Sequence, residues 1–368
     1  MDKVDILIIG AGVVGLSIAR ELADKGDLLV VEKHESFGKE TSSRNSEIIH
    51  AGIYYEPGSL KARFCIEGRR LLYEFCQENN IAHKRLGKLI VATDDSEIKR
   101  LETLFENGKG CGVDDLKMID ADEIKRLEPN ISAIAAIYSP STGILDTHQF
   151  MKQLESHAKG EGVTFAYNCE VIGFKKNSSG YAVAISDIDG ERLDIEAKVV
   201  INCAGLDSDK IAQMAGIDID KEGYKLYPNK GEYFRLSNAK AKLINHLIYP
   251  TPTQTSLGIH TVSDLGGQIR LGPSSFYVDE IDYDVDPKNS TNFFNGAKKF
   301  LPFLEEEDLS VDTAGIRPKL QAPGSPSRDF IIQDEAGKDL PGFINLVGIE
   351  SPGLTATLSI AKYIATMV

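Results

Sequence analysis

VDILIIGAGVVGLSIARELA, residues 4–23, opens the chain and decides its fold. An apolar run over residues 4–9 leads without a gap into Gly10, Gly12 and Gly15, and apolar residues then recur at helical spacing. This order predicts a strand, a tight glycine turn and a helix. In such a unit Gly10 permits the turn, Gly12 lets the backbone approach a pyrophosphate, and Gly15 lets the helix pack closely on the strand.

A carboxylate stands at the end of the second apolar run. This run, Leu28–Val31, leads into Glu32, which follows Gly10 by 22 positions. A carboxylate there accepts hydrogen bonds from a ribose diol, while the amides at the start of the helix face the phosphates. We therefore favour an adenosine dinucleotide without a 2′-phosphate over an ordinary glycine turn.

The length and the net charge limit the classes of protein to which the chain can belong. The chain has 368 residues, which suits two interlocked domains better than one core. It is 42% apolar and carries a net charge of -14, so we expect a soluble protein that binds neither nucleic acid nor anionic lipid broadly. An anionic substrate would need a local cationic pocket.

The cysteines and the apolar segments indicate a compartment. The five cysteines are odd in number and form no CxxC pair, which favours reduced thiols in the cytoplasm and no zinc site. No apolar segment is long enough to span a bilayer, and no secretory signal is present. We expect a cytoplasmic protein without a metal.

Two later segments repeat the pattern of a strand followed by small residues. Val199–Asn202 runs into Cys203-Ala204-Gly205, which returns the chain to the dinucleotide domain. Ile344–Val347 ends at Gly348 and precedes an apolar helix, a second helix start suited to an anion or a ring carbonyl. Between them, β-like segments broken by prolines over 224–273 predict a second domain.

The predicted fold class is α/β, a Rossmann-like domain interleaved with an α+β domain built on an antiparallel sheet. We place the first domain at 1–80, 145–220 and 310–368, and the second at 81–144 and 221–309. Predicted helices cover 59–79, 96–107, 120–127 and 147–159, another follows Ser290, and a hairpin over 181–195 turns at Asp189-Gly190.

A polar stretch follows Glu32 and ends in TSSRNS, residues 41–46. These hydroxyls and the amide fit a simple loop or cap, and they equally fit the lining of a phosphate and a ribityl chain. His50 stands beside Ala51 and Gly52, which leave space for a flat ring. A core histidine is as consistent with this pattern as a functional one.

Together these pieces resemble the D-amino-acid oxidase superfamily of FAD enzymes, whose members insert a substrate sheet into a Rossmann-like domain. The resemblance extends over nearly the whole chain, and the sequence motifs are most similar to those of L-2-hydroxyglutarate dehydrogenases and oxidases. Its motifs are SSRNSEIIHAGIYYEPGSLKARFC (42–65), KGEYF (230–234), LGIH (257–260), LGP (271–273), GIRP (315–318) and GIESPGLTATLSIA (348–361). The family usually has arginine where Lys230 stands, and 274–286 differs from its counterpart.

The resemblance implies FAD along the opening turn, with Gly10, Gly12 and Gly15 on the pyrophosphate and Glu32 on the adenosine ribose. Gly353, Leu354 and Thr355 would lie at the pyrimidine end of the flavin ring, where amides stabilise charge on the reduced flavin. The other residues that it places at the cofactor are Lys33, Ser42, Ser43, Asn45, His50, Val171 (through its backbone), Ala204, Gly205, Gly315 and Gly348.

The resemblance also implies substrate residues. Arg317 would clamp a carboxylate, which a planar guanidinium binds through two parallel hydrogen bonds. Oxidising a 2-hydroxy acid needs a base, and we favour His260 as base with His50 as a flavin-side or orienting group. The reverse assignment and a covalent His50–flavin bond stay open. Further candidates are Glu232 and Tyr233 for the pocket, with Glu232 also fitting a structural role, and Lys230, Tyr54 and Tyr249 for a second carboxylate.

The implied activity is oxidation of L-2-hydroxyglutarate to 2-oxoglutarate by hydride transfer to the flavin. Alternatives are an amino-acid or amine oxidase of the glycine or sarcosine type, a glycerol-3-phosphate dehydrogenase relative, and a flavin-binding assembly or tRNA-modification partner without turnover. The electron acceptor stays open among oxygen, a quinone and a carrier protein. A quinone would imply a peripheral contact with the inner membrane.

Overall fold

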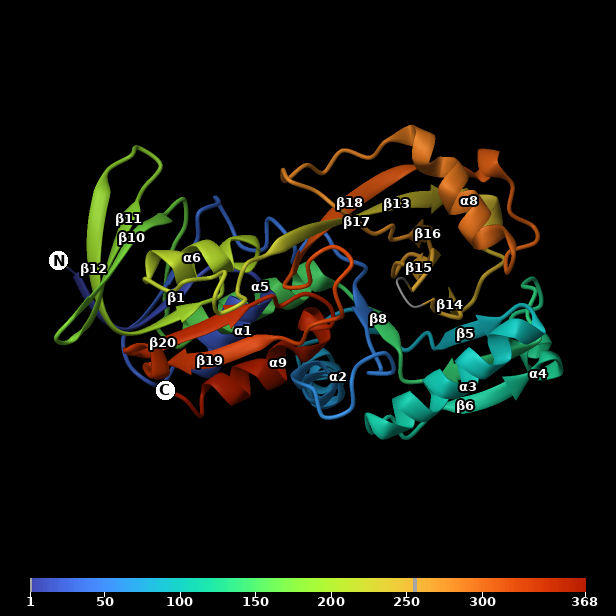
Figure 1. Cartoon of the computed structure of the whole chain (residues 1–368), viewed down its shortest axis with the longest axis horizontal. Coiled ribbons are helices and arrows are strands. Elements are labelled where there is room, and N and C mark those ends of the chain that lie inside the picture. Colours follow the sequence, from blue (N-terminus) through green and yellow to red (C-terminus); the bar gives the residue numbers. More distant parts are fainter. Residues whose placement is uncertain (1, 254–256) are drawn as a thin grey trace. The chain divides into compact units, whose positions relative to one another are not determined.

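The computed structural model describes residues 2–253 and 257–368, which form two compact units. Unit 1 comprises Met1–Ser43, Thr147–Pro228 and Arg317–Val368, and unit 2 comprises Arg44–Asp146 and Asn229–Ile316. The chain passes from one unit to the other after Ser43 and after Asp146, and again within strands β13 and β18 (Figure 1).

This division differs from the expected boundary at residue 80, because 44–80 belongs to unit 2. Strand β3 (Ile48–Ile49) pairs with β8 (Gly143–Leu145). Both strands lie in unit 2, so this pairing holds the start of 44–80 within that unit.

Unit 1 is built on an eight-stranded sheet in which five strands run parallel, in the order β9-β2-β1-β12-β20. Strand β19 pairs antiparallel with β20, and the β10–β11 hairpin extends from the first half of β12 (Figure 1). The strands are β1 (Asp2–Ile9), β2 (Leu28–Val31), β9 (Thr164–Ala166), β10 (Glu170–Asn177), β11 (Gly180–Ser186), β12 (Arg192–Asn202), β19 (Ile331–Glu335) and β20 (Leu340–Val347).

Strand β12 is longer than expected. The hairpin strand ending at Ile195 and the buried strand at Val199–Asn202 are one continuous strand. Its first half completes the hairpin with β11, and its second half lies between β1 and β20.

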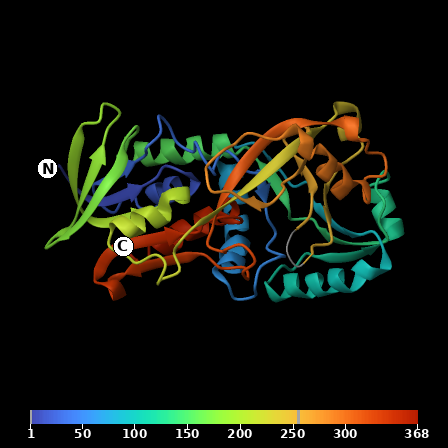
Figure 2. The ribbon, with the colours of Figure 1, turned by 45° about the horizontal axis from the view of Figure 1, so that its top comes forward.

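Four helices flank this sheet: α1 (Val13–Glu21), α5 (Thr147–Gly160), α6 (Ser208–Met214) and α9 (Gly353–Ile364). Helix α1 packs against both α5 and α9 (Figure 2). The opposite face of the sheet is a separate buried core that includes Leu7, Val183, Val200, Ile211 and Phe343. The predicted glycine turn therefore lies where the central strand β1 meets the packed helices.

The described residues of unit 2 form three sheets. One has the order β14-β5-β7-β6, another β15-β16-β13-β17 with β18 also on β13, and a small one β3-β8-β4. The antiparallel sheet expected for this domain is present, but the first sheet is mixed because β14 runs parallel to β5. The remaining strands are β4 (His83–Lys84), β5 (Lys88–Ala92), β6 (Lys117–Asp120), β7 (Ala135–Ser139), β13 (Tyr227–Leu236), β14 (Leu247–Pro250), β15 (His260–Ser263), β16 (Ile269–Gly272), β17 (Phe276–Tyr277) and β18 (Leu309–Lys319).

Three helices of unit 2, predicted at 59–79, 96–107 and 120–127, begin in the structure at side-chain caps. Ser59 accepts a hydrogen bond from the Ala62 amide, Asp94 from that of Ser96 and Asp120 from that of Glu123. The helices are α2 (Leu60–Glu78), α3 (Asp95–Gly110), α4 (Ala121–Leu127), α7 (Asn238–Ala241) and α8 (Ser290–Lys298). Short 3-10 helices cover Gly205–Asp207, Pro287–Asn289, Glu306–Asp308 and Ala336–Lys338.

The glycine turn of unit 1 has no room for side chains. Gly10 has φ +101°, and a Cβ on it would lie 2.6 Å from the carbonyl oxygen of Cys203. A Cβ on Gly15 would clash with the carbonyl oxygen of Gly10. These contacts are the close helix–strand packing that the motif predicts.

We predict that Gly15→Ala lowers the free energy of unfolding by about 2 kcal/mol or more, because the backbone of β1 or α1 must shift to relieve the clash. The matched control is Gly160→Ala in α5, where an added Cβ meets nothing within 4 Å. There the better helix propensity of alanine should leave stability unchanged or raise it by up to about 1 kcal/mol. Urea unfolding followed by circular dichroism measures both. Equal stability of the two variants would contradict the packing argument.

Candidate active site

The loops that follow the parallel strands of unit 1 carry most of the residues predicted to bind the cofactor. Gly10 follows β1, Glu32 follows β2, Ala204 and Gly205 follow β12, and Gly348 follows β20. Because these strands are parallel, their carboxyl ends meet at one edge of the sheet. That edge is where ligands bind in open α/β sheets.

Helix α1 begins at this edge without a side-chain cap on its N-cap residue, Gly12. The hydroxyl of Ser42 accepts a hydrogen bond from the Val13 amide at 2.9 Å. A Cβ on Gly12 would lie 3.0 Å from that hydroxyl oxygen, so Ser42 closes over the turn. The next amides of the first turn have no acceptor within the helix and are suited to a phosphate.

Glu32 is fixed beside the same turn. Its carboxylate accepts hydrogen bonds from the Ala11 amide at 2.8 Å and the His34 amide at 2.9 Å, and the residue is 8% exposed. A carboxylate has further lone pairs, so a ribose diol can bind without displacing these amides. The position and chemistry of Glu32 thus fit the adenosine half of a dinucleotide.

Two helix starts are joined at this edge. The hydroxyl of Thr357 on α9 donates to the Val13 carbonyl at 3.1 Å and lies 3.0 Å from the hydroxyl of Ser17. Helix α9 begins with Gly353, Leu354 and Thr355, and its N-cap makes no side-chain hydrogen bond. The positive ends of α1 and α9 are therefore held near one another, which suits a ligand with negative charge along its length.

A buried asparagine pair, which the sequence reasoning missed, shapes the loop after β12. Asn202 donates to Asn345 Oδ1 and to the Ser208 carbonyl, each at 2.7 Å, and accepts from the Ala204 amide at 3.2 Å. Since Asn202 and Asn345 are register partners on β12 and β20, this pair connects both strand ends to the Ala204–Gly205 turn. Asparagine at the end of the apolar run 199–202 was the available signal.

Lys33 is engaged in ion pairs. Its Nζ lies 2.6 Å from Asp207 and 2.8 Å from Glu40. Burial opposes the charge, but these two carboxylates raise the pKa of Lys33 above its usual value. In this structure its partners are therefore carboxylates, and its role at the cofactor stays a prediction.

The other predicted cofactor residues are divided between the two units. Val171 lies in the core of unit 1, and the Cys169 amide before it donates to the Glu32 carbonyl at 2.9 Å, so this segment runs beside Glu32. Ser43 is exposed. In unit 2, Asn45 accepts from the Glu47 amide, and a Cβ on Gly315 would clash with the Arg44 carbonyl.

Unit 2 holds a buried cluster of histidines and tyrosines. The ring of His260 stacks on that of Tyr249, with the centroids 3.7 Å apart and the planes 22° apart. His260 Nδ1 lies 2.9 Å from the Gly258 carbonyl, which can only accept. In the neutral ring Nδ1 therefore carries the hydrogen and Nε2 keeps a lone pair, the form that a general base needs.

His50 follows β3, and its electrostatic neighbours are Lys88 and His260. Burial first, and then the nearby Lys88 and His260, lower the pKa of His50 to about 3. His50 is thus neutral near pH 7. The two predicted histidines and two of the predicted tyrosines, Tyr54 and Tyr249, belong to one region of unit 2.

Lys88 is the residue of this region that the sequence reasoning missed. It is the first residue of strand β5. Its Nζ lies 4.7 Å from the ring centroid of Tyr54 and 4.8 Å from that of Tyr249. A lysine opening an otherwise apolar strand, KLIVA at 88–92, was the signal.

The charged residues of the KGEYF motif make structural contacts. Lys230 Nζ pairs with Asp282 at 2.8 Å and donates to the Asp284 carbonyl. The Glu232 carboxylate accepts from the Asp286 amide at 3.4 Å and from Asn289 Nδ2 at 2.7 Å. Tyr233, on the opposite face of β13, packs in the core that contains Tyr249.

Arg317 lies in β18 and is half-buried. It belongs to unit 1, where the nearby Lys319 pairs with Glu350 of the closing loop at 3.2 Å. The ion pair connects the strand that carries Arg317 to the loop before α9. Its role toward a substrate carboxylate stays a prediction.

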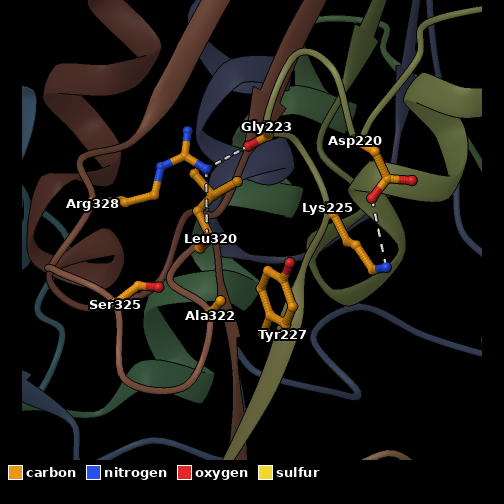
Figure 3. A pocket seen from close by; sticks show the side chains of 8 residues that line it. All are labelled: Asp220, Gly223, Lys225, Tyr227, Leu320, Ala322, Ser325 and Arg328. Carbon is orange, nitrogen blue, oxygen red and sulfur yellow. Dashed lines mark hydrogen bonds and ion pairs between the residues drawn. The ribbon is translucent and has the colours of Figure 1, made fainter.

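A surface pocket of about 180 Å³ lies elsewhere in unit 1 (Figure 3). Arg328 donates to the Gly223 carbonyl at 2.6 Å, and Lys225 lies 3.6 Å from Asp220. The pocket is smaller than the roughly 300–1,000 Å³ typical of ligand sites, and none of the predicted site residues lines it.

Three further expectations concern metal, membrane and cysteines. Among residues 2–253 and 257–368, no group of three or more His, Cys, Asp and Glu side chains is arranged to hold a metal ion. Within the same ranges, no helix is long and apolar enough to cross a membrane. All five cysteines are thiols, with no disulfide among them.

The glycine turn, the fixed carboxylate of Glu32 and the paired helix starts are the features of a dinucleotide-binding protein of the Rossmann-like class. The family model described as FAD dependent oxidoreductase (DAO) matches residues 5–367. The chain belongs to this DAO family of FAD-dependent oxidoreductases, and its cofactor is FAD.

Individual relatives cover nearly the whole chain. The mitochondrial L-2-hydroxyglutarate dehydrogenase of Arabidopsis thaliana is 39% identical over 99% of this chain and 83% of its own length. A glycerol 3-phosphate dehydrogenase of Caloramator mitchellensis is 32% identical over 98% of this chain and 72% of its own. The solved structure of the L-α-glycerophosphate oxidase of Mycoplasma pneumoniae with FAD bound has a TM-score of 0.87 and 26% identity, covering 100% of this chain and 95% of that one.

Proposed function

We propose that this protein oxidises L-2-hydroxyglutarate to 2-oxoglutarate, with FAD as the hydride acceptor. Relatives that carry the name L-2-hydroxyglutarate dehydrogenase are 39% identical in Arabidopsis thaliana and 32% identical in Homo sapiens, each over nearly the whole chain. The relative named glycerol 3-phosphate dehydrogenase supports glycerol 3-phosphate as a second candidate substrate.

The observation that carries the proposal is the orientation of His260. With Nδ1 held by the Gly258 carbonyl, Nε2 is the proton acceptor of the neutral ring. Oxidation of an alcohol requires such a base, because the hydroxyl proton must leave as hydride departs from the same carbon. An amine can react as its neutral form and does not need one.

The proposed roles follow from this chemistry. His260 Nε2 takes the hydroxyl proton as the C2–O double bond forms, and bound FAD would supply the acceptor for the hydride that leaves C2. Arg317 holds the carboxylate next to C2 in a bidentate pair, which fixes the orientation of the hydroxyl. His50, which is neutral near pH 7, orients the substrate and contributes no positive charge.

Anaerobic bleaching of the flavin by a substrate panel tests the function. We expect L-2-hydroxyglutarate to remove the yellow absorbance rapidly, and its D isomer, glycerol 3-phosphate, glycine and sarcosine to leave it. Readmitting air then shows whether oxygen restores the colour, which separates an oxidase from a dehydrogenase. Rapid bleaching by glycerol 3-phosphate or by an amine, with none by L-2-hydroxyglutarate, would contradict the proposal.

The base is tested by His260→Asn, which keeps a side-chain N–H for the Gly258 carbonyl but has no basic nitrogen. The rate of flavin reduction in a single turnover should fall by about 100- to 10,000-fold, the usual contribution of a general base. The matched control is His157→Asn on α5 of unit 1, which should reduce the flavin at the wild-type rate. Normal reduction in the His260 variant would assign the base elsewhere.

A further inference from the structure

Lys88 is buried in the sheet of unit 2 that contains β5 and β14. On these two strands, Lys88 pairs with Leu247 and Ile90 pairs with Tyr249, so these four side chains share one face. Ile90, Leu247 and Tyr249 lie in the same apolar cluster, and Lys88 itself is only 1% exposed. The ammonium group is thus carried into an apolar core.

No acid neutralises this ammonium. Within residues 2–253 and 257–368, Lys88 forms no ion pair with an Asp or Glu, and Met1 and residues 254–256 include neither type. Burial lowers the pKa of Lys88 to about 7, and the Cys65 thiol is the group that acts against this shift. By contrast Lys230, the other buried lysine considered for substrate binding, is paired with Asp282.

The partners that Lys88 does have are aromatic rings. Its Nζ lies 4.7 Å from the Tyr54 centroid and 4.8 Å from the Tyr249 centroid, and the two rings are 6.5 Å apart and nearly parallel. The negative faces of these rings attract a cation but do not replace the hydrogen bonds that a buried ammonium loses.

A second polar group of this cluster lacks a partner. The hydroxyl oxygen of Tyr54 is buried and makes no hydrogen bond with any residue that the structure describes. Burial raises the pKa of Tyr54 above its usual value, so the hydroxyl keeps its proton and can donate it. A buried donor without an acceptor is costly unless a ligand supplies one.

We propose that Lys88 and the Tyr54 hydroxyl form an anion subsite that binds the carboxylate of the substrate farther from the reacting carbon. The class of ligand is a short dicarboxylate, and this identification rests on the proposed function. A carboxylate supplies the counter-charge for Lys88 and the acceptor for Tyr54 at once.

The geometry of the cluster supports this subsite over the Lys230 alternative. His260 stacks at 3.7 Å on the same Tyr249 ring that Lys88 approaches at 4.8 Å. The proposed base and the proposed anion site therefore share a neighbour. Lys230 lies on the face of β13 shared with Phe234 and Leu236, which pack in a different core from Tyr249.

The test compares two substrates of equal carbon number. L-2-Hydroxypentanoate has a methyl group where L-2-hydroxyglutarate has its second carboxylate. In Lys88→Met we expect kcat/KM of flavin reduction to fall by about 100-fold or more for L-2-hydroxyglutarate, the range found when a buried charge pair loses one member. For L-2-hydroxypentanoate it should change by less than about threefold, so that the preference for the diacid disappears.

Three further variants complete the comparison. Tyr54→Phe should lower kcat/KM about tenfold for the diacid alone, as expected for one lost hydrogen bond to a charged group. Lys88→Arg, which keeps the charge, should restore part of the preference. Lys84→Met on the neighbouring β4, an exposed lysine of the same unit, should behave as wild type.

A binding readout keeps this test independent of turnover. Glutarate has both carboxylates but no hydroxyl to oxidise, and it should raise the melting temperature of wild-type holoenzyme and of Lys84→Met but not of Lys88→Met. Without ligand, Lys88→Met should melt at or above the wild-type temperature, because it removes an unpaired buried charge. A lysine with a purely structural role would instead lower the melting temperature when replaced.

Three outcomes would overturn the proposal. If Lys88→Met lowers kcat/KM equally for both substrates, Lys88 takes part in proton transfer; if flavin reduction is normal but reoxidation is slow, Lys88 acts on the electron acceptor. The third is that Lys230→Met, and not Lys88→Met, removes the preference for the diacid. If wild-type flavin is not reduced by L-2-hydroxyglutarate but glutarate still stabilises it through Lys88, the proposed function fails and the anion subsite stands.

Discussion

The backbone contact between the first strand and the first helix is the constraint on which the nucleotide-binding unit depends. Gly15 lies so close to the Gly10 carbonyl that no Cβ fits, and Gly10 in turn faces the Cys203 carbonyl. This packing lies at the edge where the carboxyl ends of the parallel strands, and therefore the loops that follow them, meet. Thr357 then joins α9 to the start of α1, and Glu32 is held beside the turn by the Ala11 amide. We propose that the phosphates, the ribose and the ring of the cofactor bind along this edge.

The main constraint in unit 2 is the cost of burying charge. Its polar cluster lies among apolar side chains, where ionisation is costly, and burial accordingly favours a neutral His50 and weakens the hold of Lys88 on its proton. A chain with net charge -14 was expected to need a local cationic pocket for an anionic substrate. A buried lysine without a carboxylate partner meets that need, because a substrate anion has no internal acid to displace.

Local features of the fold could be predicted from the sequence, and features set by strand pairing could not. The glycine turn and the helices predicted at 59–79 and 120–127 each depend on neighbouring residues. Whether Lys88 faces Tyr249 depends on the pairing of β5 with β14, more than 150 positions later. The same holds for Asn202 and Asn345, and for the face of β13 on which Lys230 and Glu232 lie. Motif resemblance named both His260 and His50, which lie in one region of unit 2, but it did not name Lys88 beside them.

The central claim is that the edge of the unit 1 sheet holds FAD between two helix starts and a ribose carboxylate. The most direct measurement is the identity and amount of flavin released by acid from the purified protein, determined by chromatography against FAD and FMN standards. The account predicts FAD at about one molecule per chain, because we propose that Glu32 and the glycine turn bind the adenosine half. A protein that releases FMN, or that contains no flavin and gains none when incubated with FAD, would contradict it.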